Sequence, residues 1–136
     1  MKDSIFQRLL NLHPKFSDLS LGRIKRLLKK IDFDENLLPK VIHIAGTNGK
    51  GSVIAFLRAL AEDSGITAHV YSSPHLCRFN ERIRLAGRLI DDAALADLLE
   101  EVETINGPRQ VTFFEVTTAA AMLAFSRHPA DLLFLE

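Results

Sequence analysis

The sequence predicts an α/β protein in which parallel strands are covered by helices on both faces. Apolar runs at residues 41–45, 66–71 and 130–135 are separated by segments whose apolar residues recur at helical spacing. A loop with three glycines joins the first run to the helix that follows it. Strands alternating with helices favour a parallel sheet, so we expect a three-layer fold with a three-stranded sheet in the middle.

The first 39 residues are predicted to be a helical N-terminal segment. Residues 4–12 and 19–30 have amphipathic periodicity, and residues 32–39 form a polar connector. In the second helix an apolar stripe opposes five cations, which we interpret mainly as a solvated face: Arg23, Lys25, Arg26, Lys29 and Lys30. A role for these cations in attracting an anionic substrate is the weaker alternative.

Residues 40–136 are predicted to form a βαβ nucleotide-binding core. Val41–Ala45 is expected to be a buried strand and Ile66–Tyr71 a second one. The helix between them is expected from about Ser52 to Asp63, with Gly65 as its cap and this apolar stripe: Val53, Phe56, Leu57, Leu60 and Ala61. After an extended segment at 80–90, helices are expected at about 92–104 and 113–127, and residues 130–135 form the third strand.

Composition narrows the range of functions. Seventeen basic and seventeen acidic residues cancel, so we expect no nucleic-acid partner. No apolar run approaches the roughly 18 residues that a membrane helix needs, and no secretory leader is evident. Cys77 is the only cysteine, which fits a reducing compartment and a small structural side chain. We therefore expect a cytoplasmic protein.

The loop after the first strand predicts a phosphate site. Glycines let backbone N–H groups approach phosphate oxygens, the helix start adds partial positive charge, and a lysine neutralises the outer phosphates. The spacing departs from the usual phosphate loop, because only two residues separate Gly46 from Gly49-Lys50 and Gly51 precedes Ser52. A glycine-rich turn with a solvated lysine is the alternative interpretation.

Three other positions have side chains suited to ligand chemistry. Ser73 and Glu136 follow two of the predicted strands and are candidate magnesium ligands, although the residues alone favour a Ser-Pro turn and a frayed terminal acid. The segment Thr112-Phe113-Phe114-Glu115 joins two aromatic rings to a carboxylate. It suits a flat heteroaromatic ligand, or alternatively a first-turn acid beside two core phenylalanines.

Taken together, these segments resemble the folylpolyglutamate synthase family, which includes bifunctional dihydrofolate synthases. The matching segments are residues 44–52, 71–76, 79–83, 112–115 and 131–136, in the family's order. That family is part of the wider group of Mur-ligase-like, ATP-dependent amide-forming ligases. The resemblance implies an incomplete Mur-ligase-like central ATP-binding domain whose shifted glycine spacing is the family's own.

The resemblance also implies an activity: ATP-dependent addition of L-glutamate to folate or dihydropteroate through an acyl phosphate, in folate biosynthesis. Lys50 would be catalytic, and the ATP phosphates would be held by these residues: Gly46, Thr47, Asn48, Gly49, Lys50, Gly51 and Ser52. Ser73 and Glu136 would bind Mg²⁺. The pteroate portion would contact Thr112, Phe113, Phe114 and Glu115, and more loosely Asp18 and Leu19.

The departure from that family is length, since full members have roughly three times as many residues. A C-terminal domain is missing, so we expect these 136 residues alone to be an inactive N-terminal fragment, and the full-length protein to be a monomer. Two alternatives are an ATP-binding module without ligase activity and a fragment of a Mur-type cell-wall ligase. The sequence leaves open whether dihydropteroate, reduced folates or both are substrates.

Overall fold

The computed structural model describes residues 2–11 and 20–136, which belong to two compact units. The first unit comprises residues 1–34 and 92–123, and the second comprises residues 35–91 and 124–136. The two helices in the second half of the chain fall mostly in the first unit, together with the N-terminal helices. The boundary predicted at residue 39 would instead have grouped those two helices with the sheet. Among the described residues, no helix combines the length and apolarity that crossing a membrane requires.

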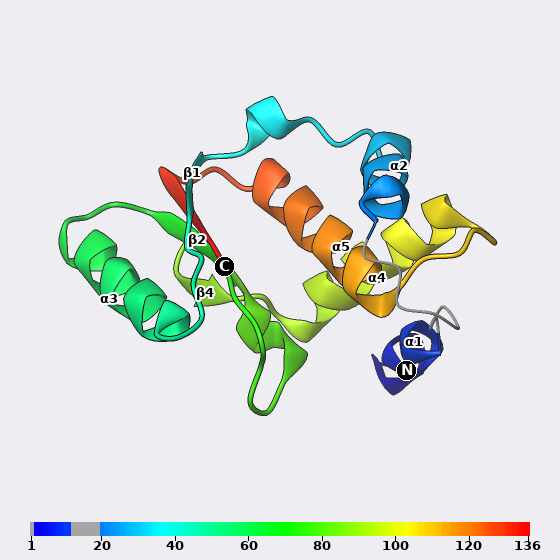
Figure 1. Cartoon of the computed structure of the whole chain (residues 1–136), viewed down its shortest axis with the longest axis horizontal. Coiled ribbons are helices and arrows are strands. Elements are labelled where there is room, and N and C mark those ends of the chain that lie inside the picture. Colours follow the sequence, from blue (N-terminus) through cyan, green and yellow to red (C-terminus); the bar gives the residue numbers. More distant parts are fainter. Residues whose placement is uncertain (1, 12–19) are drawn as a thin grey trace. The chain divides into compact units, whose positions relative to one another are not determined.

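The first unit consists of helices. It contains α1 (Lys2–Leu10), α2 (Gly22–Lys30), α4 (Asp92–Asn106) and all but the last turn of α5 (Phe113–Arg127) (Figure 1). The leucines and the valine on one face of α4 are buried: Leu95, Leu98, Leu99 and Val102. Ile5 and Leu9 of α1 are buried too, and Arg8 pairs with Glu103 of α4 at 2.9 Å.

The second unit is built on a five-stranded sheet with the order β1-β5-β2-β3-β4. Its strands are β1 (Lys40–His43), β2 (Ala68–Tyr71), β3 (Ile83–Leu85), β4 (Arg88–Leu89) and β5 (Leu132–Leu135). The three predicted strands are present, and β1, β5 and β2 are parallel as expected. Two 3-10 turns, η1 (Glu35–Leu37) and η2 (Phe79–Arg82), complete the unit with α3 (Lys50–Asp63).

The prediction of a purely parallel, three-stranded sheet is wrong. The extended segment at 80–90 folds into a hairpin, and its strand β3 pairs antiparallel with β2. The two residues between β3 and β4, Ala86 and Gly87, both have positive φ, at 47° and 85°. Positive φ at both positions gives the tight turn whose twist matches a two-residue hairpin.

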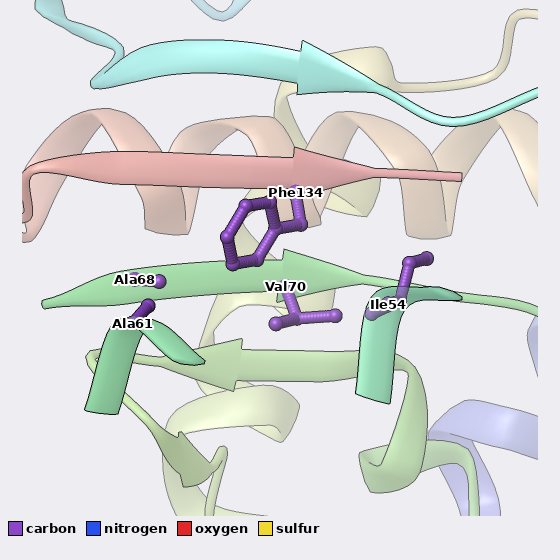
Figure 2. Packing of buried hydrophobic residues seen from close by; sticks show 5 residues of the cluster. All are labelled: Ile54, Ala61, Ala68, Val70 and Phe134. Atoms are coloured by element: carbon purple, nitrogen blue, oxygen red, sulfur yellow. The ribbon is translucent and has the colours of Figure 1, made fainter. Parts of the chain in front are cut away.

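One face of the sheet packs against α3. Ile54 and Ala61 of the helix contact Ala68 and Val70 of β2 and Phe134 of β5, and all five side chains are buried (Figure 2). Side chains alternate between the two faces of a strand, so His69 and Tyr71 lie on the opposite face of β2. Both of these rings contact Phe125 near the end of α5.

Two expectations about burial are corrected. All four residues of β1 are exposed, because β1 is an edge strand with β5 as its only neighbour in the sheet. On α3, the predicted stripe mixes two faces: Leu57 and Ala61 face the sheet, whereas Val53, Phe56 and Leu60 are 46%, 71% and 65% exposed. The helix is thus apolar on both sides, a pattern typical of helices with neighbours on both sides.

Candidate nucleotide and metal site

The glycine-rich loop joins the end of β1 to the start of α3. Ile44 N–H donates to Leu135 O at 2.7 Å, which extends the pairing with β5 by one residue before the chain leaves the sheet. Gly46 and Gly49 have φ of 151° and 78°, in the region that favours glycine. Helix α3 begins at Lys50, two residues before the predicted start, with Gly49 as its N-cap.

The start of α3 leaves backbone donors available. Its first helical hydrogen bond runs from Val53 N–H to Gly49 O at 3.0 Å. No side chain from the described part of the chain caps this end, and the first turn has no acidic residue. The N–H groups of residues 50–52 therefore have no partner within the helix, and the helix dipole adds positive charge beside them. Such a helix start suits an anion.

The Lys50 side chain folds back onto the glycine-rich loop. Its Nζ donates a hydrogen bond at 2.7 Å to Gly46 O, at the opposite end of that loop from the start of the helix. This contact holds an ammonium group next to the backbone donors, which is where a lysine neutralises a bound phosphate.

Ser73 and Glu136 are brought together beyond the carboxyl ends of β2 and β5. Glu136 Oε2 accepts the Ser73 N–H at 3.0 Å, and Glu136 N–H donates to Tyr71 O at 3.0 Å. Glu136 is therefore tied down on both its backbone and its side chain, which does not fit a frayed terminal acid. A hydroxyl and a carboxylate at this edge fit Mg²⁺, which keeps several waters and needs few protein ligands. Within the described residues no three His, Cys, Asp or Glu side chains are grouped for a metal.

The loop that carries Ser73 is ordered by Glu81, a residue to which the sequence analysis gave no role. Its carboxylate accepts the N–H groups of Leu76, Cys77 and Arg78 at 2.8, 2.9 and 2.7 Å. These backbone hydrogen bonds, with that of Leu76 the strongest, lower the pKa of Glu81. The sequence carries no capping-box signal for it, because Arg78 stands where Ser, Thr, Asp or Asn is usual.

His75 is the other polar side chain of that loop. Its Nδ1 accepts a hydrogen bond from Arg82 Nε at 2.8 Å, and its ring meets Phe79 edge-on with centroids 5.6 Å apart. The Arg82 guanidinium also lies over the Phe79 ring, 5.2 Å from its centroid. His75 thus serves as a hydrogen-bonding loop residue.

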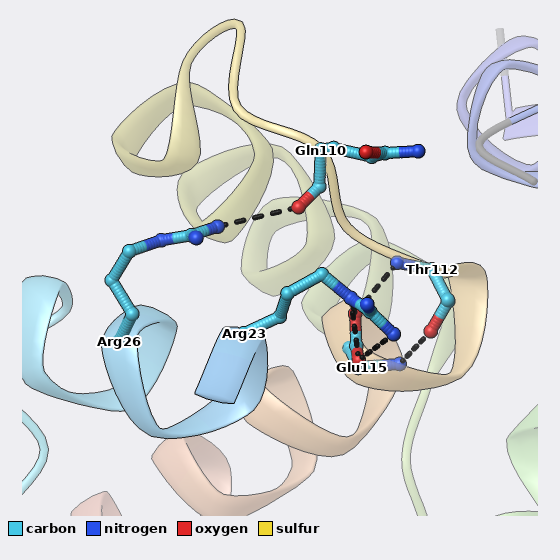
Figure 3. A network of polar contacts seen from close by, with 5 residues as sticks. All are labelled: Arg23, Arg26, Gln110, Thr112 and Glu115. Atoms are coloured by element: carbon cyan, nitrogen blue, oxygen red, sulfur yellow. Dashed lines mark hydrogen bonds and ion pairs between the residues drawn. The ribbon is translucent and has the colours of Figure 1, made fainter. Parts of the chain in front are cut away.

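In the aromatic segment at the start of α5, the Glu115 carboxylate is ion-paired and hydrogen-bonded. Arg23 Nη2 lies 2.9 Å from Glu115 Oε1, and Arg23 Nε donates to both carboxylate oxygens (Figure 3). Thr112 and Glu115 form a reciprocal cap, since Thr112 N–H donates to Glu115 Oε2 at 2.8 Å and Glu115 N–H donates to Thr112 Oγ1 at 3.1 Å. Phe113 contacts Phe6, with ring centroids 6.4 Å apart, while Phe114 is 54% exposed.

The predicted solvated face of α2 holds for Lys25, Lys29 and Lys30, which are exposed, but is wrong for Arg23, which is half-buried and ion-paired. Besides the Arg23 pair, Arg26 Nη2 donates to Gln110 O at 3.3 Å (Figure 3). Lys30 Nζ donates to Asn106 O, also at 3.3 Å. These contacts join α2 to the end of α4, to the segment between α4 and α5, and to the start of α5. Asp18 and Leu19, the looser candidates for substrate contact, lie outside the described residues.

The chain thus belongs to the class of α/β proteins in which a glycine-rich loop links a parallel strand to a helix start. No family model matches it. It is 35% identical to the dihydrofolate synthase/folylpolyglutamate synthase of Escherichia coli over 94% of this chain and 30% of that protein. It is 37% identical to the Bacillus subtilis protein of the same name over 85% of this chain and 28% of that protein.

Solved structures give the same relationship. Escherichia coli FolC in complex with DHPP and ADP matches with a TM-score of 0.88 and 34% identity, over 99% of this chain and 32% of that one. The bifunctional Yersinia pestis enzyme complexed with AMPPNP and Mn ion matches with a TM-score of 0.88 and 32% identity, over 99% and 33%. The chain is related to the folylpolyglutamate synthase/dihydrofolate synthase family and spans about a third of the length of these relatives.

Proposed function

We propose that residues 46–52 bind the phosphates of ATP and that this chain supplies the phosphate-binding part of a ligase. The observation that carries the proposal is the uncapped start of α3 beside Gly46, Gly49 and the Lys50 ammonium. Support comes from relatives whose solved structures are described as complexes with ADP or AMPPNP. The activity of the whole protein is then addition of L-glutamate to folate or dihydropteroate.

Each loop residue has a task in this proposal. Gly46 and Gly49 place their neighbours' N–H groups toward the phosphates, and Thr47, Asn48, Gly51 and Ser52 complete the wrapping. Lys50 exchanges its contact with Gly46 O for phosphate oxygens and stabilises the charge that develops during phosphoryl transfer. Ser73 and Glu136 hold Mg²⁺, which when bound neutralises phosphate charge.

The substrate residues of the proposal lie in the first unit. Thr112, Phe113, Phe114 and Glu115 contact the pteroate portion, together with Asp18 and Leu19. The exposed ring of Phe114 offers a stacking surface. Because Arg23 and Thr112 already engage both oxygens of Glu115, its part in binding is to hold the segment in shape rather than to meet a ring N–H.

Thermal unfolding with and without Mg-ATP tests the nucleotide site. Free ligand at 100 times its Kd stabilises the folded state by about 2.7 kcal/mol, so wild type should show a clear rise in Tm. Lys50→Ala should lose that rise, and Lys40→Ala, an exposed lysine at the far end of β1, should keep it. An unchanged response to ATP in Lys50→Ala would reject the loop as the phosphate site.

A nucleotide-binding module without ligase activity is the second candidate. It is favoured by the engagement of both Glu115 oxygens, which are already bound by Arg23 and Thr112. Dihydropteroate separates the two: stabilisation by both ligands supports the ligase, whereas stabilisation by ATP alone supports the bare module.

A further inference from the structure

A pocket of about 270 Å³ lies within the second unit, between α3 and the β2–β3 part of the sheet. Apolar side chains form part of its wall, among them Ile54, Val70 and Leu76. The polar part of its lining comes from Arg58 of α3, Arg84 of β3, Ser72 and Glu81. The functional proposal above assigns no role to these two arginines.

The guanidinium of Arg58 lacks a full set of hydrogen-bond acceptors among its described neighbours. Its Nε is buried and has no hydrogen-bond partner among the residues that the structure describes. The nearest acid is Glu62 on the next turn, whose Oε1 is 3.7 Å from that Nε, too far for an N–H···O hydrogen bond. The Arg58 side chain is nevertheless 30% exposed, so other parts of it remain accessible. A buried polar atom without a partner is rare and calls for an explanation.

Arg84 adds a second cation to the same pocket. Its Nη1 donates to Gly87 O at 3.4 Å, a long contact for a guanidinium. Burial, followed by the positive charge of Arg58, lowers the pKa of Arg84, while Glu62 acts in the opposite direction. Two partly desolvated cations therefore lie close enough to repel each other, and the negative charge of Glu62 offsets this only in part.

The carboxylate in the pocket lining, Glu81, is already engaged in hydrogen bonds. Glu81 accepts three backbone N–H groups, which stabilise its charge and hold it against its own loop. The pocket therefore combines two guanidiniums that have donors to spare with no carboxylate free to pair with them among its lining side chains.

We propose that this pocket binds the oxyanion group of a small ligand, a carboxylate or a phosphate, between the guanidiniums of Arg58 and Arg84. Guanidinium forks match both groups in geometry, and the Ser72 hydroxyl provides a further donor. The apolar walls suit a short aliphatic portion. The site is separate from the proposed ATP loop, although Gly51 lies at the border of both.

Thermal unfolding of the full chain in low salt tests this site with two probes, inorganic phosphate and L-glutamate, against sodium chloride at equal ionic strength. At about ten times Kd, a bound probe should raise Tm by about 4 °C. Arg58→Met and Arg84→Met keep the aliphatic stem and should reduce the rise to below about 1 °C. Arg88→Met, an exposed arginine on β4, is the matched control and should keep the full rise.

The two probes distinguish the source of the oxyanion. A rise with phosphate alone assigns a phosphate group, and a rise with glutamate alone assigns a carboxylate. The Nε–H signals of Arg58 and Arg84 in ¹H–¹⁵N spectra of wild type should shift with the same probe, a readout that does not depend on the variants folding.

Three results would overturn the proposal: no rise beyond that of chloride with either probe, a rise that survives both methionine variants, or arginine Nε–H signals that stay fixed. A rise lost in Lys50→Ala but kept in Arg58→Met and Arg84→Met would also overturn it, by assigning the anion to the loop. Because the nucleotide test depends on Lys50 and this one on the two arginines, either proposal can fail while the other stands.

Discussion

Acid should destabilise the second unit through His69, a fully buried histidine on β2. Its Nε2 lies 2.8 Å from His128 O, and its Nδ1 accepts the Ala86 N–H at 2.8 Å. A carbonyl can only accept and an amide N–H can only donate, so the ring must be neutral with its proton on Nε2. A second proton, on Nδ1, would point at the Ala86 N–H and break that hydrogen bond.

The direction of the pH effect follows from this geometry. Burial, the largest cause, lowers the pKa of His69 below its ordinary value of 6.5. The unfolded chain then binds the proton more readily than the folded one. Stability is full above pH 6.5 and falls by up to about 1.4 kcal/mol per pH unit as the pH drops from 6.5 toward the folded pKa.

Urea unfolding of wild type and His69→Gln between about pH 7.5 and pH 5 measures the effect. At neutral pH the variant should lose about 2–4 kcal/mol, because the Ala86 N–H is left unpaired and the ring contact with Phe125, 5.5 Å between centroids, is removed. Glutamine does not titrate, so the stability gap should narrow as the pH falls below 6.5. A gap that stays constant over this range would refute the reasoning.

Three further predictions concern packing and charge. Ile54→Ala should lower the free energy of unfolding, measured with urea, by about 2–5 kcal/mol, because the side chain is buried against β2. Leu60→Ala, on the exposed face of α3, should lower it by less than about 0.5 kcal/mol. Equal losses would contradict the assignment of the two faces. Arg23→Met should cost about 2–3 kcal/mol, since it leaves the Glu115 carboxylate, 11% exposed, without its cation, and a loss below about 0.5 would show that the pair is solvated. Hydrogen bonds from Thr67 lower the pKa of Asp131 below 3.8, and its backbone N–H contributes more than its hydroxyl. This carboxylate therefore stabilises the fold above pH 3.8, and less as the pH falls through the folded pKa. An NMR titration of its carboxyl carbon that gives a pKa of 3.8 or more would disprove this.

Sequence periodicity located most elements because it reports local geometry. Apolar runs located β2 and β5, helical spacing located α4 and α5, and the glycines marked the loop before α3. The helical stripe of α4 was assigned correctly because only one face of that helix is apolar. On α3, apolar residues occupy two faces, and periodicity alone could not say which of them meets the sheet.

In the candidate site, too, local sequence identified the residues but not the contacts between distant ones. The order of strand, glycine loop and helix, together with family resemblance, was enough to nominate Lys50, Ser73 and Glu136. That Ser73 and Glu136 meet depends on β2 and β5 being adjacent parallel strands, and their 63-residue separation in sequence hides this. Likewise, no local pattern predicts that Arg23 reaches Glu115 or that Arg58 and Arg84 share a pocket.

The sequence by itself therefore determined which segments are helix or strand, where the backbone turns, and to which family the chain is related. Those properties depend on residues within a few positions of one another. Only the tertiary structure decided that β1 lies at an edge, that β3 and β4 extend the sheet antiparallel, and which cations are paired. These outcomes depend on distant segments excluding water and exchanging hydrogen bonds, and such pairings leave no periodic trace in the chain.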